Sequence, residues 1–253
     1  MAARITLIGG PTVLIEIGGW RLLTDPTFDP PGEYPLPHTT LVKTAGPART
    51  LDEIGHIDVV LLSHDQHADN LDHAGRRLLE RATRVITTPA AAQRLGHPVE
   101  GLAPWANATL SRPGKADLNV TATPARHGPV GIEPIIGEVA GFVIQGQQIP
   151  EIYITGDTVW YEGVAQVAQR FSPRILILFA GAARTRGAFA LTMDVNGALE
   201  TAYAFPESTI IPVHCDGWKH FSQDRDDLEL SFQALGVAHR LRLPPAGVPL
   251  EIV

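Results

Sequence analysis

Four segments of the sequence contain an apolar, strand-like run that ends at residues able to bind a metal. They read VVLLSHDQHADN (59–70), TATPARHGP (121–129), IYITGDT (152–158) and TIIPVHCDG (209–217). Successive side chains of a strand point to opposite faces, so a run such as VVLL, apolar throughout, predicts a strand that is buried on both sides. Such strands require a layered fold, in which the residues that follow the strands gather in a common crevice.

The order of the expected elements indicates which layered fold this is. We expect strands at 4–8, 12–17, 21–24, 58–62, 84–87, 118–123, 142–144, 152–154, 175–179, 208–213 and 238–243, and helices at 71–82, 90–95, 159–170, 194–204 and 226–235. Strands come first and strand–helix alternation follows, which favours two sheets with helices outside them, an α/β (α+β) fold. With 253 residues, 44% of them hydrophobic, the chain can bury a full core, and we expect a single domain over residues 1–253.

One segment does not fit this alternation. Residues 25–50 contain six prolines and show little periodicity. The segment is too long for an ordinary connection, so we expect a functional loop near a site.

Charge and composition exclude several classes of partner. A net charge of −7 and a pI near 5.8 argue against binding of nucleic acid, which requires a basic surface. The sequence contains neither a basic cluster nor a stretch of roughly 20 apolar residues, so it gives no indication of contact with a membrane. The single cysteine, Cys215, excludes an internal disulfide and fits a reducing cytoplasm. We therefore expect a cytoplasmic protein with a small-molecule substrate, and the oligomeric state stays open.

The residues at the strand ends form a candidate metal centre. Imidazole and carboxylate ligands together suit zinc, manganese or iron. Taken alone, each residue has a simpler interpretation: Asp69 could cap the helix that follows, although Asp72 fits that role better. Their joint occurrence at strand ends favours a metal site built from His64, His67, Asp69, His127, Asp157 and His214.

Taken together, these motifs resemble those of the metallo-β-lactamase fold superfamily. Within it, the likeness is to the branch that contains L-ascorbate-6-phosphate lactonases and N-acyl-phosphatidylethanolamine phospholipases. The opening strands TLIGGPTVLIEIGGWRLLTDPTF, the histidine-rich loop, the histidine after a strand, the GDT aspartate and the late PVH histidine carry the resemblance, which runs nearly end to end. It implies a four-layer αββα sandwich with the metals at one edge of the two sheets.

The resemblance also implies a division of the ligands between two metal positions. His64, His67 and His127 would hold one metal, Asp69 and His214 the second, and Asp157 would bridge them. The chain departs from the family pattern twice. Gln66 stands where the second histidine of the motif is usual, so either Gln66 or His67 is the ligand, and Asn70 replaces the last histidine.

We therefore expect one or two divalent ions, one bound more weakly than the other. Zinc is the first expectation, with manganese or iron as alternatives.

The expected chemistry is hydrolysis by a metal-activated hydroxide, which could cleave a lactone, ester, amide or phosphodiester. Asp157 would hold the hydroxide and Asp69 would pass a proton to the leaving group. Asp65 and His220, with Gln66 and Asn70, are candidates to orient ligands or contact substrate. Two alternatives remain: a phosphodiesterase or nuclease, and a non-catalytic metal-binding protein of the same fold.

Overall fold

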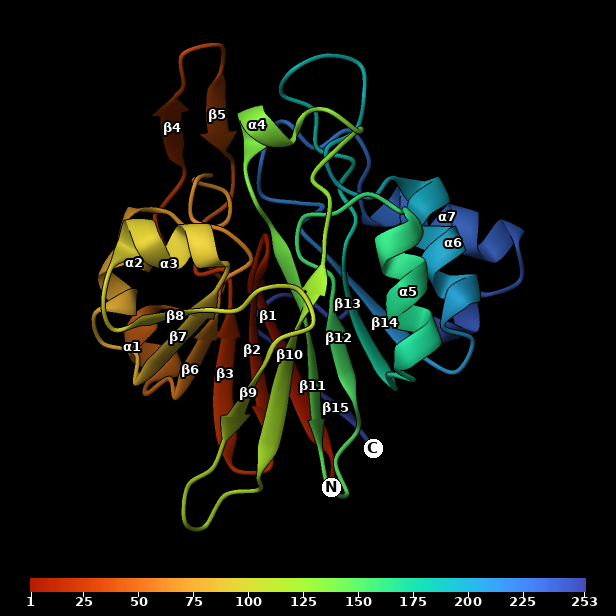
Figure 1. Cartoon of the computed structure of the whole chain (residues 1–253). Helices are drawn as coiled ribbons and strands as arrows, with labels where there is room; N and C mark the ends of the chain where they lie inside the picture. The colour runs from red at the N-terminus through yellow and green to blue at the C-terminus, as the bar shows by residue number, and fades with distance from the viewer.

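The computed structural model describes residues 1–253, and Figure 1 shows two sheets packed face to face between two groups of helices. The first sheet contains, in order, β15 (Leu250–Ile252), β1 (Ala3–Gly9), β2 (Thr12–Ile17), β3 (Trp20–Thr24), β6 (Val59–Leu61), β7 (Arg84–Thr87) and β8 (Val99–Gly101). The second contains β14 (Thr209–Val213), β13 (Ile175–Phe179), β12 (Ile152–Ile154), β11 (Ala140–Gly146), β10 (Leu118–Pro124) and β9 (Asn107–Leu110).

The helices cover the outer faces of the sheets. Beside the first sheet lie α1 (Leu51–Ile54), α2 (His73–Leu79) and α3 (Pro89–Leu95), and beside the second lie α5 (Glu162–Arg170), α6 (Val195–Ala204) and α7 (Arg225–Ala234). None of the helices combines the length and the apolar sequence that crossing a bilayer requires.

Strand β13 shows why the chain forms four layers. Its residues Ile175, Ile177 and Phe179 pack in the core between the two sheets. The intervening Leu176 and Leu178 face the other way, into the core beneath α5, α6 and α7. All five residues are buried because each face of the strand has a cover. The structure confirms the expected αββα sandwich.

The strand directions bring the motifs to one edge. Strands β12, β13 and β14 are mutually parallel, and β10 runs in the same direction because it is antiparallel to β11, which is antiparallel to β12. In the first sheet, β3, β6 and β7 are parallel. The polar segments after β6, β10, β12 and β14 therefore leave their strands at the ends that face the upper loops in Figure 1.

The segment 25–50 contains more structure than its prolines suggest. It forms a hairpin of β4 (Gly32–Pro35) and β5 (Thr40–Lys43) that projects at the top of Figure 1, near α4 (Glu133–Ile136). The strand expected at 238–243 is wrong: Ala238–Arg240 form a short 3-10 helix, and a single bridge joins Leu241 to Ile210 of the edge strand β14.

Candidate metal centre

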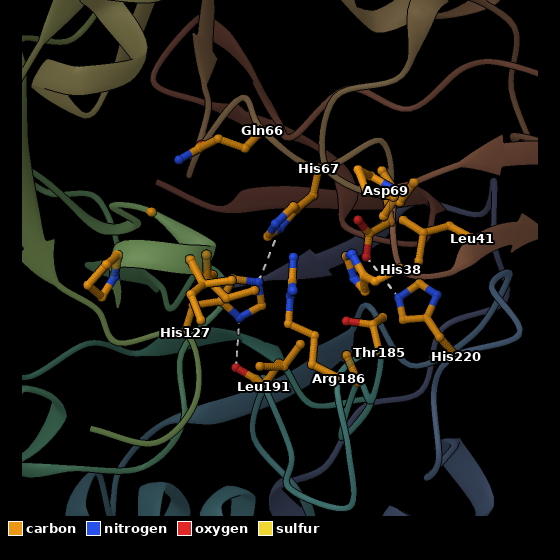
Figure 2. A pocket seen from close by; sticks show the side chains of 17 residues that line it. His38, Leu41, Gln66, His67, Asp69, His127, Thr185, Arg186, Leu191 and His220 are labelled. Atoms are coloured by element: carbon orange, nitrogen blue, oxygen red, sulfur yellow. Dashed lines mark hydrogen bonds and ion pairs between the residues drawn. The ribbon is translucent and has the colours of Figure 1, made fainter. Parts of the chain in front are cut away.

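The loop after β6 sends two histidines toward a common point. His64 Nε2 lies 2.8 Å from His67 Nδ1, and His67 Nδ1 lies 3.2 Å from Nε2 of His127, which follows β10. Figure 2 shows the His67 and His127 rings facing each other. Asp157, from the loop after β12, joins them, with Oδ2 at 3.4 Å from His127 Nε2. The ligand atoms of these four residues all lie within 4.8 Å of one another.

A second group adjoins the first and shares one residue with it. Asp69 Oδ2 lies 3.3 Å from His214 Nε2, and His214 Nε2 lies 3.7 Å from Asp157 Oδ1. Asp69, Asp157 and His214 each offer a ligand atom within 4.8 Å of the other two. Asp157 thus presents one carboxylate oxygen to each group. The structure brings together all six side chains that the sequence indicates, in the division that the resemblance implies.

The donor set fits divalent cations. Asp157 Oδ1 and His214 Nε2 are buried and have no hydrogen-bond partner within the protein, although unpaired buried polar atoms are costly. Burial, and then the neighbouring His67 and His127 rings, hold the pKa of His64 well below its ordinary value. Burial and the His127 ring lower the pKa of His67 to about 4. These imidazoles are therefore neutral at pH 7 and have lone pairs for a metal.

Hydrogen bonds behind the centre orient two of the rings. His127 Nδ1 donates to the Leu191 carbonyl oxygen at 2.8 Å, which leaves Nε2 as a lone pair facing the group. Ser63 Oγ lies 2.9 Å from His64 Nδ1 and donates to Asp25 Oδ2 at 2.7 Å. Partners of this kind fix the orientation of a metal-binding imidazole. Sequence reasoning missed Asp25, although it directly follows β3 at the same sheet edge.

Of the two residues that compete for the second motif position, His67 faces the group. The Gln66 side chain points away from it in Figure 2 and accepts a bond from the Asp65 backbone amide at 3.1 Å. A Cβ at Gly137 would overlap Gln66 Nε2, so glycine at that position makes room for this orientation.

Two other polar residues of the loop lie outside the two groups. Asn70 is fully buried and donates to Asp25 Oδ2 at 3.1 Å, so it supports the hydrogen bonds behind His64. Asp65 does not reach the centre, because its carboxylate forms an ion pair with Arg94 of α3, with Nε at 3.0 Å from Oδ1. The helix cap is Asp72, whose side chain accepts from Gly75 N at the start of α2.

His220 lies at the border between the centre and the surface. Its Nε2 is 2.9 Å from Asp69 Oδ2, the oxygen that also approaches His214. Burial alone would raise the pKa of the Asp69 carboxyl, but the His220 and His214 imidazoles beside it hold that pKa well below its usual range. Asp69 is therefore an anion at neutral pH.

A pocket of about 360 Å³ opens onto the two groups. Its floor is formed by His67, Asp69, His127 and His220. Its walls come from the β4–β5 hairpin, the loop after β6, α4 with the glycine that ends it, and the loop after β13. They contribute Leu36, Pro37, His38, Leu41, Gln66, Pro134, Ile135, Ile136, Gly137, Ala183, Thr185, Arg186 and Leu191. His64, Asp157 and His214 lie beneath this floor, buried from solvent.

Comparison with known proteins places the chain in a family. Residues 20–215 match the Beta-lactamase superfamily domain. A UPF0173 metal-dependent hydrolase of Methanosphaerula palustris is 27% identical over 251 residues, which cover 96% of this chain and 98% of that protein.

Two solved structures share the fold over nearly their whole length. Isothiocyanate hydrolase from Delia radicum gut bacteria is 20% identical, with a TM-score of 0.83 and coverage of 98% of both chains. Igni18, a metallo hydrolase from Ignicoccus hospitalis, is 19% identical, with a TM-score of 0.75 and coverage of 100% of this chain and 99% of that one. The branch within the superfamily stays a prediction. The family match and the shared fold together show that the chain belongs to the beta-lactamase superfamily.

Proposed function

We propose that this protein is a metal-dependent hydrolase that cleaves a lactone, ester, amide or phosphodiester bond in a small molecule. One observation carries the proposal: two groups of buried histidines and aspartates share Asp157 beneath the floor of a pocket. The name of the Methanosphaerula palustris relative, a metal-dependent hydrolase, supports it.

The ligand assignment follows from the two groups. His64, His67 and His127 would hold one cation, Asp69 and His214 the second, and Asp157 both. Zinc suits this nitrogen-rich set, and manganese or iron is the alternative. When bound, the cations supply an activated water and polarise the carbonyl or phosphoryl oxygen of the substrate.

The protein side chains orient the substrate and move the proton. Asp69 is the only carboxylate among the residues that line the pocket. Asp69 is an anion at neutral pH, so we assign to its Oδ2 the acceptance of a proton from the attacking water and the transfer of that proton to the leaving group, because Asp69 belongs to the second group and also lines the pocket. The hydrogen bond from His127 to Leu191 and the contact of Ser63 with His64 hold the two imidazole rings in fixed orientations toward the centre.

The pocket lining favours a substrate with an acidic group beside an apolar part. Arg186 is the only arginine or lysine in the lining, and its guanidinium extends toward His67 and His127 in Figure 2. Sequence reasoning did not single out this residue. Leu36, Leu41 and Ile135 provide the apolar surface.

We expect Arg186→Ala to raise KM about 10-fold or more for substrates that carry a carboxylate or phosphate, because hydrogen bonds to charged groups contribute roughly 1.5–3 kcal/mol. Neutral substrates of the same shape should be unaffected. Arg184→Ala is the matched control, since Arg184 is exposed on the same loop but does not line the pocket. Steady-state kinetics on paired anionic and neutral esters measure the difference, and equal effects on both would contradict this role.

The proposed activity is tested by removing and restoring the metal. Purified protein is assayed against lactones, esters, amides and phosphodiesters before and after chelation, with metal per chain measured in parallel. We expect turnover to disappear with the metal and to return with zinc, manganese or ferrous iron. Duplex DNA and RNA in the same panel test the nuclease alternative, which the net charge of −7 disfavours. Bound metal without turnover of any of these substrates would instead favour the non-catalytic metal-binding alternative, and turnover that survives complete removal of the metal would overturn the proposed metal dependence.

A further inference from the structure

We propose that His220 is a ligand of the second metal position and supplies the imidazole that the motif loop lacks at Asn70. This inference rests on the proposed function, because it concerns the same metal centre. The second position would then be held by Asp69, Asp157, His214 and His220.

The two groups are unequal without His220. The first contains three imidazoles and one carboxylate, whereas the second contains one imidazole and two carboxylates. Asn70 does not correct this, because it has no imidazole: its Nδ2 donates to Asp25, and its buried Oδ1 could offer only an amide oxygen, a weaker ligand for zinc than imidazole. The residue at the usual ligand position of the loop has thus become part of the hydrogen bonding that orients the first group.

His220 is a histidine that contacts the second group from outside it, through Asp69. Its Nε2 lies 2.9 Å from Asp69 Oδ2, and the same oxygen lies 3.3 Å from His214 Nε2. The imidazole side chain is 9% exposed, and its Nδ1 is buried without a hydrogen-bond partner. Figure 2 shows the ring directed at the Asp69 carboxylate rather than into solvent.

The backbone around His220 is held on both sides. The His220 carbonyl oxygen accepts from Arg184 N at 2.9 Å, and Lys219 N donates to the Val42 carbonyl oxygen at 3.0 Å. The ring packs between Trp218, with centroids 5.9 Å apart, and Phe221, at 4.6 Å. A side chain fixed in this way loses little conformational entropy on binding a metal.

The loop after β14 would thus provide two ligands. His214 directly follows the strand, and His220 returns to the same carboxylate six residues later. The sequence departs from the usual motif at Asn70, but a histidine from another part of the chain compensates for it. The second position would then have two imidazoles and two carboxylates, a set that suits zinc.

The experiment measures metal binding rather than activity. Chelated wild-type protein and the His220→Gln variant are titrated with zinc, and bound metal is counted by native mass spectrometry. We expect two ions in the wild type and one in His220→Gln, with the second dissociation constant raised on the order of 100-fold or more, since loss of an outer-shell partner alone costs 10–100-fold. His38→Gln is the matched control, because His38 lines the same pocket on the β4–β5 hairpin.

The possible results separate this inference from the proposed function. Wild-type protein that binds neither zinc nor, in parallel titrations, manganese or ferrous iron would overturn the proposed function and this inference with it. Two ions in His220→Gln at wild-type affinity would overturn the inference alone, and would leave His220 as a residue that acts on Asp69 without binding metal. A His220→Asn variant repeats the measurement if His220→Gln does not fold, as judged by its circular dichroism.

Discussion

Asp157→Ala is expected to abolish binding of both metal ions and to lower kcat/KM by about 10³-fold or more. The residue offers Oδ2 to the first group and Oδ1 to the second, so a single substitution removes a ligand from each. A metal supplies several kcal/mol of transition-state stabilisation, and each 1.36 kcal/mol corresponds to a factor of ten in rate. Metal per chain and turnover, measured on the same preparation, check both parts of the prediction.

Two further variants make the result specific. His127→Ala should also reduce metal content and turnover, but it removes a ligand only from the first group, so one ion should remain. Asp65→Asn is the control: Asp65 is an aspartate of the same loop, but it pairs with Arg94 outside the centre, and this variant should keep two ions. Unchanged metal content in both Asp157→Ala and His127→Ala would refute the ligand assignment.

The strand-end pattern predicted the convergence of the centre because it depends on local sequence. Runs such as VVLL and ILILF are apolar on both faces, and only a strand between two layers buries both. Given two sheets with strands in a common direction, residues such as Asp157 and His214 at the strand ends must meet at one edge. The order of elements and the convergence of the six side chains were therefore predictable.

Contacts between distant segments were not predictable in the same way. The sequence leaves Gln66 and His67 as alternative ligands. The Gln66 side chain can turn away from the centre because Gly137, 71 positions later, has no side chain in its way, and such a contact is not visible in the sequence. Asn70 could not be assigned, because its partner Asp25 follows a different strand, β3, and the two side chains meet only after the sheet has formed.

The hairpin formed by β4 and β5 was missed for a related reason. Its strands have four residues each; no residue of β4 is buried, and the two buried residues of β5 are Leu41 and Lys43, so the sequence shows no apolar run. The hairpin depends on a tertiary contact instead. Lys43, the last residue of β5, is 4% exposed, and its Nζ lies 2.9 Å from Oδ2 of the fully buried Asp72 side chain. A lysine at the end of a weak strand gives no sign of this burial.

Lys43→Met is expected to lower the free energy of unfolding by about 3–5 kcal/mol, because removing one partner of a buried ion pair leaves an uncompensated charge. Asp72 cannot turn to solvent without further loss. Its Oδ1 accepts from Gly75 N at 2.8 Å to cap α2, and its Oδ2 accepts from Asp29 N at 2.7 Å. Denaturant unfolding should show the loss, together with a fall in Tm of roughly 6–20 °C.

The same substitution should affect substrate binding in the pocket without affecting metal binding at the centre. The hairpin tip carries Leu36, His38 and Leu41 of the pocket, whereas no metal-ligating side chain lies on it. Lys43→Met should therefore raise KM while metal per chain stays unchanged. Lys219→Met, at an exposed lysine of the neighbouring loop, should alter neither stability nor kinetics.

The double variant Lys43→Met, Asp72→Asn tests whether the unpaired buried carboxylate of Asp72 causes the loss of stability in Lys43→Met. Asparagine keeps an oxygen to cap α2 but removes the unpaired carboxylate, so the double variant should recover part of the stability that Lys43→Met loses. If it is instead less stable than Lys43→Met by the full cost of Asp72→Asn alone, the two side chains do not interact energetically. The hairpin would then owe its position to the packing of Tyr34 against Trp218 rather than to the ion pair.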